Sequence, residues 1–411
     1  MKKLIHYFIL SFATVSGLLL TACSKDELVH EEIGNPVVSK EKASPVVFET
    51  SVSLFDADTR AEITSKSDLA ISGFGVFAYY HDGNNTTDGA YSSASTPSFM
   101  YNQEVASADA GVSWTSSPIK YWPNETTTDG NGATSEHTDK LSFLAYAPYT
   151  SVLSGTDPGI YAFTSVTAAG DAKVSYRVSP DDPSKGVDLM WAVDPTTGQP
   201  LLNLTKKAIG EKVNMKFYHA LTKLDIKAQL SVEQLPGGGT LDPNTKVYVE
   251  GLYLIPQQTD ADKLLGLEGN FNLNTTYSSS SSAGWEITTK YDATAANNNN
   301  IKIKDAKKYG AGGAGVTTTS ESLLDGPLMF IPINGSATYK YNVRLVYHVV
   351  TGTSDVTNDI VQENVEIPFL QGTGNTLVAI IGLTSVKFTV SVSNWTDDTK
   401  AVTLRSTDEV F

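Results

Sequence analysis

The chain has 411 residues, a formal net charge of −15 and a single cysteine. This acidic balance argues against nucleic-acid binding, because the phosphates would repel the protein. One cysteine leaves no disulfide possible within the chain. Stability therefore has to come from packed cores. The length favours two domains over one.

The N-terminus has the layout of a secretory signal. Two lysines precede an apolar run over 4–20, and the sequence Leu-Thr-Ala-Cys ends at Cys23. This ending resembles a bacterial lipobox, in which the cysteine is acylated and becomes the first mature residue. A plain signal peptide that happens to contain a cysteine is the alternative. We expect a signal peptide over 1–22, a lipid on Cys23 that reaches the outer membrane, and a polar tether over 23–45.

The rest of the chain is predicted to be all-β. Short runs rich in Val, Ile, Tyr and Phe recur between clusters of Gly, Asn, Asp, Ser and Thr. In the run 46–55 the apolar residues alternate, which is typical of a half-buried strand. Further strands are expected in the segments 74–80, 141–146, 174–178, 223–230, 246–255, 341–350 and 386–392. Helix is expected only as short turns, at 67–69 and 263–265.

The least strand-like stretch near the middle of the chain, 193–210, is rich in proline and glycine. We therefore predict a domain boundary near residue 205. An N-terminal β-sandwich would cover 46–205 and a C-terminal one 206–398. A last segment, 399–411, would follow them.

Motifs for catalysis are weak. None of the six histidines pairs with another at the short spacings of zinc sites, and the chain has neither a Gly-x-Ser-x-Gly elbow nor a phosphate-binding loop. Acidic pairs such as Asp181-Asp182 lack the periodicity of calcium ligands. The sequence therefore predicts no enzyme, no metal and no cofactor. A pair of glycosidase carboxylates far apart in sequence stays open.

The aromatic segment Tyr121-Trp122-Pro123 has two interpretations. Its rings can pack in a core, because aromatic side chains contribute much of the burial energy of a domain. They can also form a platform on which a sugar stacks.

Several aromatic-rich segments occur in a fixed order along the chain. They are Phe74-Gly-Val-Phe-Ala-Tyr79, Tyr121-Trp122-Pro123, Leu141-Ser-Phe-Leu-Ala-Tyr-Ala-Pro148, Asp188-Leu-Met-Trp-Ala192, Met215-Lys-Phe-Tyr-His-Ala-Leu-Thr-Lys-Leu224 and the Val-x-Val-x-x-Trp of Val390 to Trp395. In order and spacing these segments resemble the fimbrillin family, the type V pilins of Bacteroidales-type bacteria. The resemblance implies two transthyretin-like β-sandwich domains in a structural subunit of a cell-surface fimbria that supports adhesion.

The resemblance also implies a maturation pathway. Fimbrillins are exported as lipoproteins, trimmed by an arginine-specific protease and polymerised on the cell surface. In this chain Arg60 is the first arginine, in a polar segment directly after the run 46–55. We expect cleavage between Arg60 and Ala61, which would release the lipid anchor together with the first strand. A surface arginine without this role is the alternative.

Losing the first strand would leave unpaired backbone groups at a sheet edge, where another copy or a related fimbrial subunit can add a strand. By resemblance the donor is the C-terminal segment 399–411, with Val402, Leu404 and Val410 as candidate residues, although polar residues interrupt their alternation. Such a head-to-tail contact propagates into a filament. The competing prediction is a monomeric outer-membrane surface lipoprotein that binds glycans and keeps its lipid and first strand.

Overall fold

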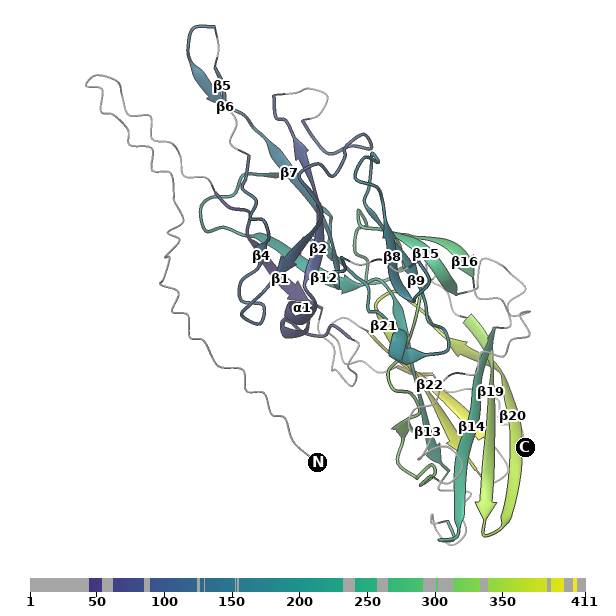
Figure 1. Ribbon diagram of the computed structural model, residues 1–411. Coiled ribbons are helices and arrows are strands. Elements are labelled where there is room, and N and C mark those ends of the chain that lie inside the picture. Colours follow the sequence, from purple (N-terminus) through teal and green to yellow (C-terminus); the bar gives the residue numbers. More distant parts are fainter. Residues whose placement is uncertain are drawn as a thin grey trace, which may run out of the picture. The chain divides into compact units, whose positions relative to one another are not determined.

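Strands dominate the computed structural model of the protein (Figure 1). The structure describes residues 44–53, 62–84, 89–123, 126–128, 130–151, 153, 155–231, 241–256, 265–290, 301, 313–332, 339–382, 386–394 and 402–404. The strands are β1 Phe48–Val52, β2 Phe74–His81, β3 Met100–Ala106, β4 Thr115–Ser116, β5 Thr126–Thr128, β6 Thr134–Glu136, β7 Lys140–Ala147, β8 Gly159–Phe163, β9 Lys173–Arg177, β10 Met190–Val193, β11 Leu201–Thr205, β12 Val213–His219, β13 Thr222–Leu230, β14 Thr245–Pro256, β15 Gly266–Asn272, β16 Trp285–Lys290, β17 Glu321–Ser322, β18 Leu328–Phe330, β19 Tyr339–Thr351, β20 Ser354–Ile367, β21 Thr373–Ile381, β22 Val386–Asn394 and β23 Val402–Leu404. The all-β fold class is confirmed.

The runs predicted as strands all contain one. In β1 the side chains of Phe48, Thr50 and Val52 are buried while Ser51 is exposed. This alternation follows from the two-residue period of a strand with one face against the core. Within the described ranges no helix has the length and apolar character that a membrane crossing requires.

The helical turn expected at 67–69 lies in α1, Lys66–Ser72, and the one expected at 263–265 begins outside the described residues. α1 begins at Ser65, whose hydroxyl accepts a hydrogen bond from the backbone N–H of Asp68 (3.1 Å). It ends at Gly73, where φ is 63°, a left-handed conformation that glycine adopts without a Cβ clash. A short 3-10 turn, η1, covers Pro183–Lys185.

The N-terminal half is built on one large sheet with the strand order β1-β12-β10-β7-β2-β3-β4, and β11 lies beside β7. β1 and β12 run parallel, whereas the other pairs are antiparallel. A four-stranded sheet, β16-β15-β9-β8, covers one face of it. Rings from the two sheets meet there: Trp191 lies 5.1 Å from Phe271, and Phe77 lies 5.6 Å from Phe163, between ring centroids.

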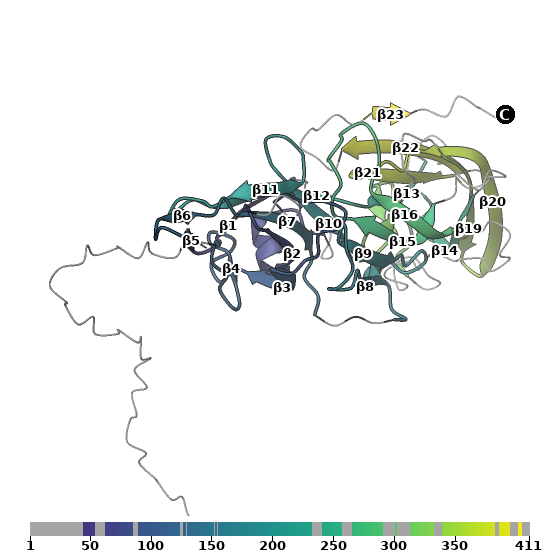
Figure 2. The ribbon, with the colours of Figure 1, turned by 90° about the horizontal axis from the view of Figure 1, so that it is seen from above.

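The C-terminal half has a sheet with the order β17-β13-β21-β22-β23, to which β18 adds beside β13, and a three-stranded sheet, β14-β19-β20. β13 and β21 are parallel neighbours. Leu224 and Leu377 of the first sheet and Leu345 and Tyr347 of the second belong to one buried cluster. Figure 2 shows β23 along the outer side of β22.

The division into two domains at residues 205 and 206 stays a prediction. Strand pairing crosses that point in both directions. β12 comes after residue 206 but pairs with β1 and β10 of the N-terminal sheet. β9 comes before it but pairs with β15.

Candidate functional site

The edge strand β1 has backbone partners on both sides. On one side it pairs with β12 along its whole length. On the other side Phe48 bridges to Trp114, and the backbone N–H of Val46 donates to the carbonyl of Lys120 (2.8 Å). The strand therefore lies in a slot between β12 and the segment 114–122, which we call the β1 slot.

The side chains of this N-terminal segment complete the hydrophobic core. Val46, Phe48 and Val52 are buried, and Phe48 is fully enclosed. The Phe48 ring stands edge-on to Phe74 and Phe143, with centroids 5.8 and 5.7 Å away. Burying three such apolar side chains contributes about 5–9 kcal/mol before the cost of ordering the strand is subtracted. Removing β1 would open this core to water.

Several buried polar atoms of the β1 segment and of the neighbouring segment 114–122 lack hydrogen-bond partners within the described ranges. Thr50 Oγ1, Ser53 Oγ, Trp114 Nε1 and Trp122 Nε1 are buried and have no hydrogen-bond partner among the described residues. Each buried polar group left in this way costs about 1–3 kcal/mol. Thr50 and Ser53 would leave together with β1, whereas the indole N–H groups of Trp114 and Trp122 would remain, so a replacement strand that accepted hydrogen bonds from them would gain contacts that β1 does not make.

On the outward side of β1, Glu49 is held between two lysines. Its carboxylate accepts hydrogen bonds from the ammonium groups of Lys212 and Lys66. The pKa of Glu49 is lowered below its usual value. The main cause is the hydrogen bond from Lys212, and the second is the hydrogen bond from Lys66. These contacts hold the exposed face of the strand to the residue before β12 and to the start of α1.

The chain is fixed again directly after the segment 54–61. The Lys223 ammonium lies 2.7 Å from the Glu62 carboxylate, and both side chains are at least nine-tenths buried. The next backbone N–H, of Ile63, donates to Asp188 Oδ2 (3.0 Å), and the other oxygen of Asp188 lies 2.8 Å from His219 Nδ1. Glu62 is thus anchored to β13, and Ile63 to Asp188, which lies two residues before β10 and in turn contacts His219 at the end of β12. We call this set of contacts the Glu62 anchor.

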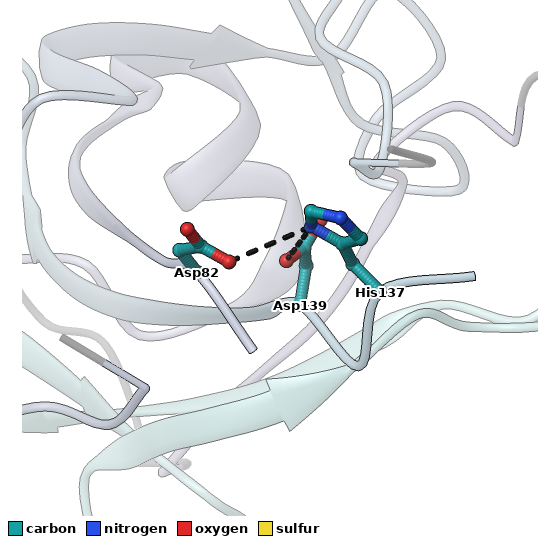
Figure 3. Close-up of side chains that lie close together, drawn as sticks. All are labelled: Asp82, His137 and Asp139. Atoms are coloured by element: carbon teal, nitrogen blue, oxygen red, sulfur yellow. Dashed lines mark ion pairs between the residues drawn. The ribbon is translucent and has the colours of Figure 1, made fainter. Parts of the chain in front are cut away.

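A second cluster lies at the far end of the β2–β7 pair. Asp82, His137 and Asp139 each bring a ligand-type atom to within 4.8 Å of the others, with their side chains turned toward one another (Figure 3). Sequence reasoning missed this cluster because it looked for paired histidines. The signal that could have found it is His-x-Asp before β7, opposite an Asp that follows β2.

Most of the predicted site residues lie outside the part of the chain that the structure describes: Cys23, Arg60, Ala61 and Val410. Val402 and Leu404 lie in β23, whose backbone pairs antiparallel with β22 through Val392↔Val402 and Val390↔Leu404. Lipidation, cleavage and strand donation remain predictions.

In the segment considered as a sugar platform, Tyr121 is 49% exposed but Trp122 lies in the core, as does Trp191 of β10. Trp122 is 2% exposed and Trp191 is 1% exposed. The indole N–H of Trp191 donates to the carbonyl of Thr275 (2.9 Å). The packing interpretation of Trp122 is confirmed, and neither indole ring is available to stack a sugar at the surface.

Comparison with protein-family models finds no match, and comparison with curated proteins finds none either. Among solved structures, a fimbrial protein from Bacteroides vulgatus matches with a TM-score of 0.55 and 24% identity, over 85% of this chain and 99% of that chain. A proposed cell adhesion protein from Bacteroides uniformis matches with a TM-score of 0.41 and 16% identity, over 86% and 98%. A fimbrial assembly protein from Parabacteroides distasonis matches with a TM-score of 0.31 and 12% identity, over 88% and 100%.

Only the first of these likenesses is close enough to establish a fold. It shows that the chain has the β-sandwich fold of a Bacteroides fimbrial protein. The resemblance to the fimbrillins that the sequence motifs suggested is thereby confirmed at the level of the fold.

Proposed function

We propose that this chain is a structural subunit of a cell-surface fimbria and that it has no catalytic role. The observation that carries the proposal is the β1 slot. There an N-terminal edge strand lies between β12 and the segment 114–122, and its apolar side chains complete the core. The likeness to a fimbrial protein supports a cell-surface location and association with other fimbrial subunits.

The proposed pathway begins with export as a lipoprotein acylated at Cys23 and held at the outer membrane. An arginine-specific protease then cuts between Arg60 and Ala61. This position lies between β1 and the Glu62 anchor, so a cut there separates the strand from the rest of the fold while the downstream side stays bonded to Lys223. The cut also removes the covalent link that kept β1 at a high effective concentration beside its slot.

The vacated slot would then bind a strand from another subunit. Backbone groups on both sides of the slot offer ladder partners, and the aromatic floor offers pockets for alternate side chains. The indole N–H groups of Trp114 and Trp122, which have no hydrogen-bond partner in the described part of the chain, are donors that a replacement strand could use. The candidate donor is the C-terminal segment 399–411, with Val402, Leu404 and Val410. Its displacement from β22 breaks a ladder of three residue pairs.

The test uses the purified precursor and an arginine-specific protease. We expect one cut after Arg60, followed by ladders of polymer on a denaturing gel run without heating. The matched control is Arg60→Ala, which keeps every other arginine and should stay monomeric and retain β1. Ladders formed by uncut Arg60→Ala, or complete cutting at Arg60 with only monomer left, would overturn the proposal.

The alternative of a monomeric glycan-binding lipoprotein rested on the aromatic segment Tyr121-Trp122-Pro123 as a sugar platform. Because Trp122 is buried, only the 49% exposed ring of Tyr121 is left in that segment to contact a sugar. A sugar array probed with the uncut precursor measures it directly.

A further inference from the structure

We propose that Asp82, His137 and Asp139 form a binding site for one divalent transition-metal ion of the zinc class. The pairing of β2 with β7 creates the arrangement. Their antiparallel register ends at His81↔Lys140, and one further step along it sets Asp82 opposite Asp139. His137 precedes Asp139 by two residues, which is the spacing that returns a side chain to the same side of an extended segment.

Two aspartates opposite each other repel, and such like-charge pairs destabilise a sheet. A cation bound between the two carboxylates would remove this repulsion. Asp139 cannot avoid the repulsion by turning to solvent, because its side chain is 3% exposed. Its Oδ1 accepts a hydrogen bond from the Gly83 N–H (3.0 Å), while its Oδ2 is buried with no hydrogen-bond partner among the described residues. A buried, unsatisfied carboxylate oxygen calls for a bound ion or water.

The distances fit a metal better than direct hydrogen bonds. His137 Nδ1 lies 3.5 Å from Asp82 Oδ1 and 3.7 Å from Asp139 Oδ1, beyond the usual range of an N–H···O bond. For an ion with ligand bonds of about 2.0–2.2 Å, the edges of a coordination tetrahedron are about 3.3–3.6 Å. Small side-chain adjustments would bring the three atoms to that spacing.

The ligand types narrow the choice of ion. Calcium takes six to eight oxygen ligands and magnesium an octahedron of oxygens, whereas imidazole with carboxylates suits zinc and its neighbours. The side chain of Asp82 is 38% exposed. This opening leaves a fourth position that water or a group from outside the chain can fill.

His348 also lies beside two carboxylates, but their arrangement around the ring differs from that at His137. His348 makes hydrogen bonds of 2.8 Å to Asp355 and 2.7 Å to Glu250, each from a different ring nitrogen. The two carboxylates thus lie on opposite sides of that ring and cannot share one ion with a single nitrogen. His348→Gln is therefore a matched control for His137→Gln.

The experiment uses the full-length chain, without a histidine tag, after treatment with a chelator. Titration with Co²⁺ should give one ion per chain and the visible absorption of low-symmetry cobalt, and Zn²⁺ should displace it. We expect His137→Gln, Asp82→Asn and Asp139→Asn each to weaken binding by at least about tenfold, while His348→Gln leaves it unchanged.

Circular dichroism separates loss of a ligand from loss of the fold. If Asp139→Asn fails to fold, Asp82→Asn and His137→Gln carry the test. Absence of saturable binding by Co²⁺, Zn²⁺ and Mn²⁺ to the parent would overturn the proposal. So would unchanged affinity in folded His137→Gln, or equal loss in His348→Gln.

Discussion

The two terminal strands of the described fold, β1 and β23, are held at sheet edges in different ways. β1 has backbone partners on both sides and contributes Phe48 to the floor of the core. Among the described residues β23 pairs only with β22, through three residue pairs. Losing β1 opens a core, whereas losing β23 removes one short ladder. In the proposed assembly this difference suits β1 to be the strand that is replaced and β23 to be the strand that leaves to bind elsewhere.

The sharpest test of this contrast is Phe48→Ala. Because Phe48 is fully buried against two other rings, we expect the free energy of unfolding of the uncut precursor to fall by about 4 kcal/mol. Urea unfolding followed by fluorescence measures it. Val356→Ala, at a 54% exposed valine, is the control and should change stability by less than about 0.5 kcal/mol. Equal effects of the two substitutions would contradict the core role of β1.

The Glu62 anchor is predicted to hold the chain after β1 independently of that strand. Lys223→Met removes the ammonium partner of a buried carboxylate, so we expect a loss of about 3 kcal/mol. The double variant Glu62→Gln/Lys223→Met should recover part of the loss. Lys173→Met breaks an exposed pair with Glu286 and should cost less than about 1 kcal/mol in the same unfolding assay. A loss in Lys223→Met no larger than this would argue against the anchor.

Deletion of residues 402–411 tests the role of β23 and of the segment that follows it. We expect a change of at most about 1 kcal/mol in the stability of the monomer, because the described part of this segment, Val402–Leu404, forms three residue pairs. Polymer formation after protease treatment should nevertheless disappear. A truncated chain that still forms ladders would show that the donor strand lies elsewhere.

The smallest expected effect concerns the outward face of β1. Glu49→Gln removes the charge that binds Lys212 and Lys66 at a partly exposed site, so about 0.5 kcal/mol is expected at neutral pH. Since the pKa of Glu49 is lowered in the folded state, its stabilisation is complete above the ordinary glutamate pKa of about 4.3 and is lost as the pH falls through the lower folded value. Parent and variant should therefore converge in stability in acid. A difference that persists there would exclude the ion pairs as its cause.

The strands were predictable from sequence because their signal is local. Alternation of buried and exposed residues marks β1 without knowledge of its partners. Ser65 and Asp68 mark the start of α1, although seven residues are too few for an apolar stripe. The pairing was not predictable: nothing in the run 46–55 indicates a parallel neighbour at β12, far along the chain.

The candidate sites show the same limit. Glu62 and Lys223 are separated by 161 residues, and only the fold brings them together. Asp82 and Asp139 become neighbours through the register of β2 and β7, which their own surroundings in sequence do not define. The motif residues that lie in β2, β7, β10 and β12 are mostly buried, so these motifs report the core more directly than they report any site.

The direction of β1 has a consequence for anything that replaces it. β1 runs parallel to β12, so an incoming segment that repeats its hydrogen bonds has to enter with the same heading. Because the groove and the proposed donor segment are different parts of the molecule, each added molecule would face the way its predecessor faces. The resulting fibre would have two unlike ends, one offering an empty groove and the other a free tail, and growth at one would not mirror growth at the other.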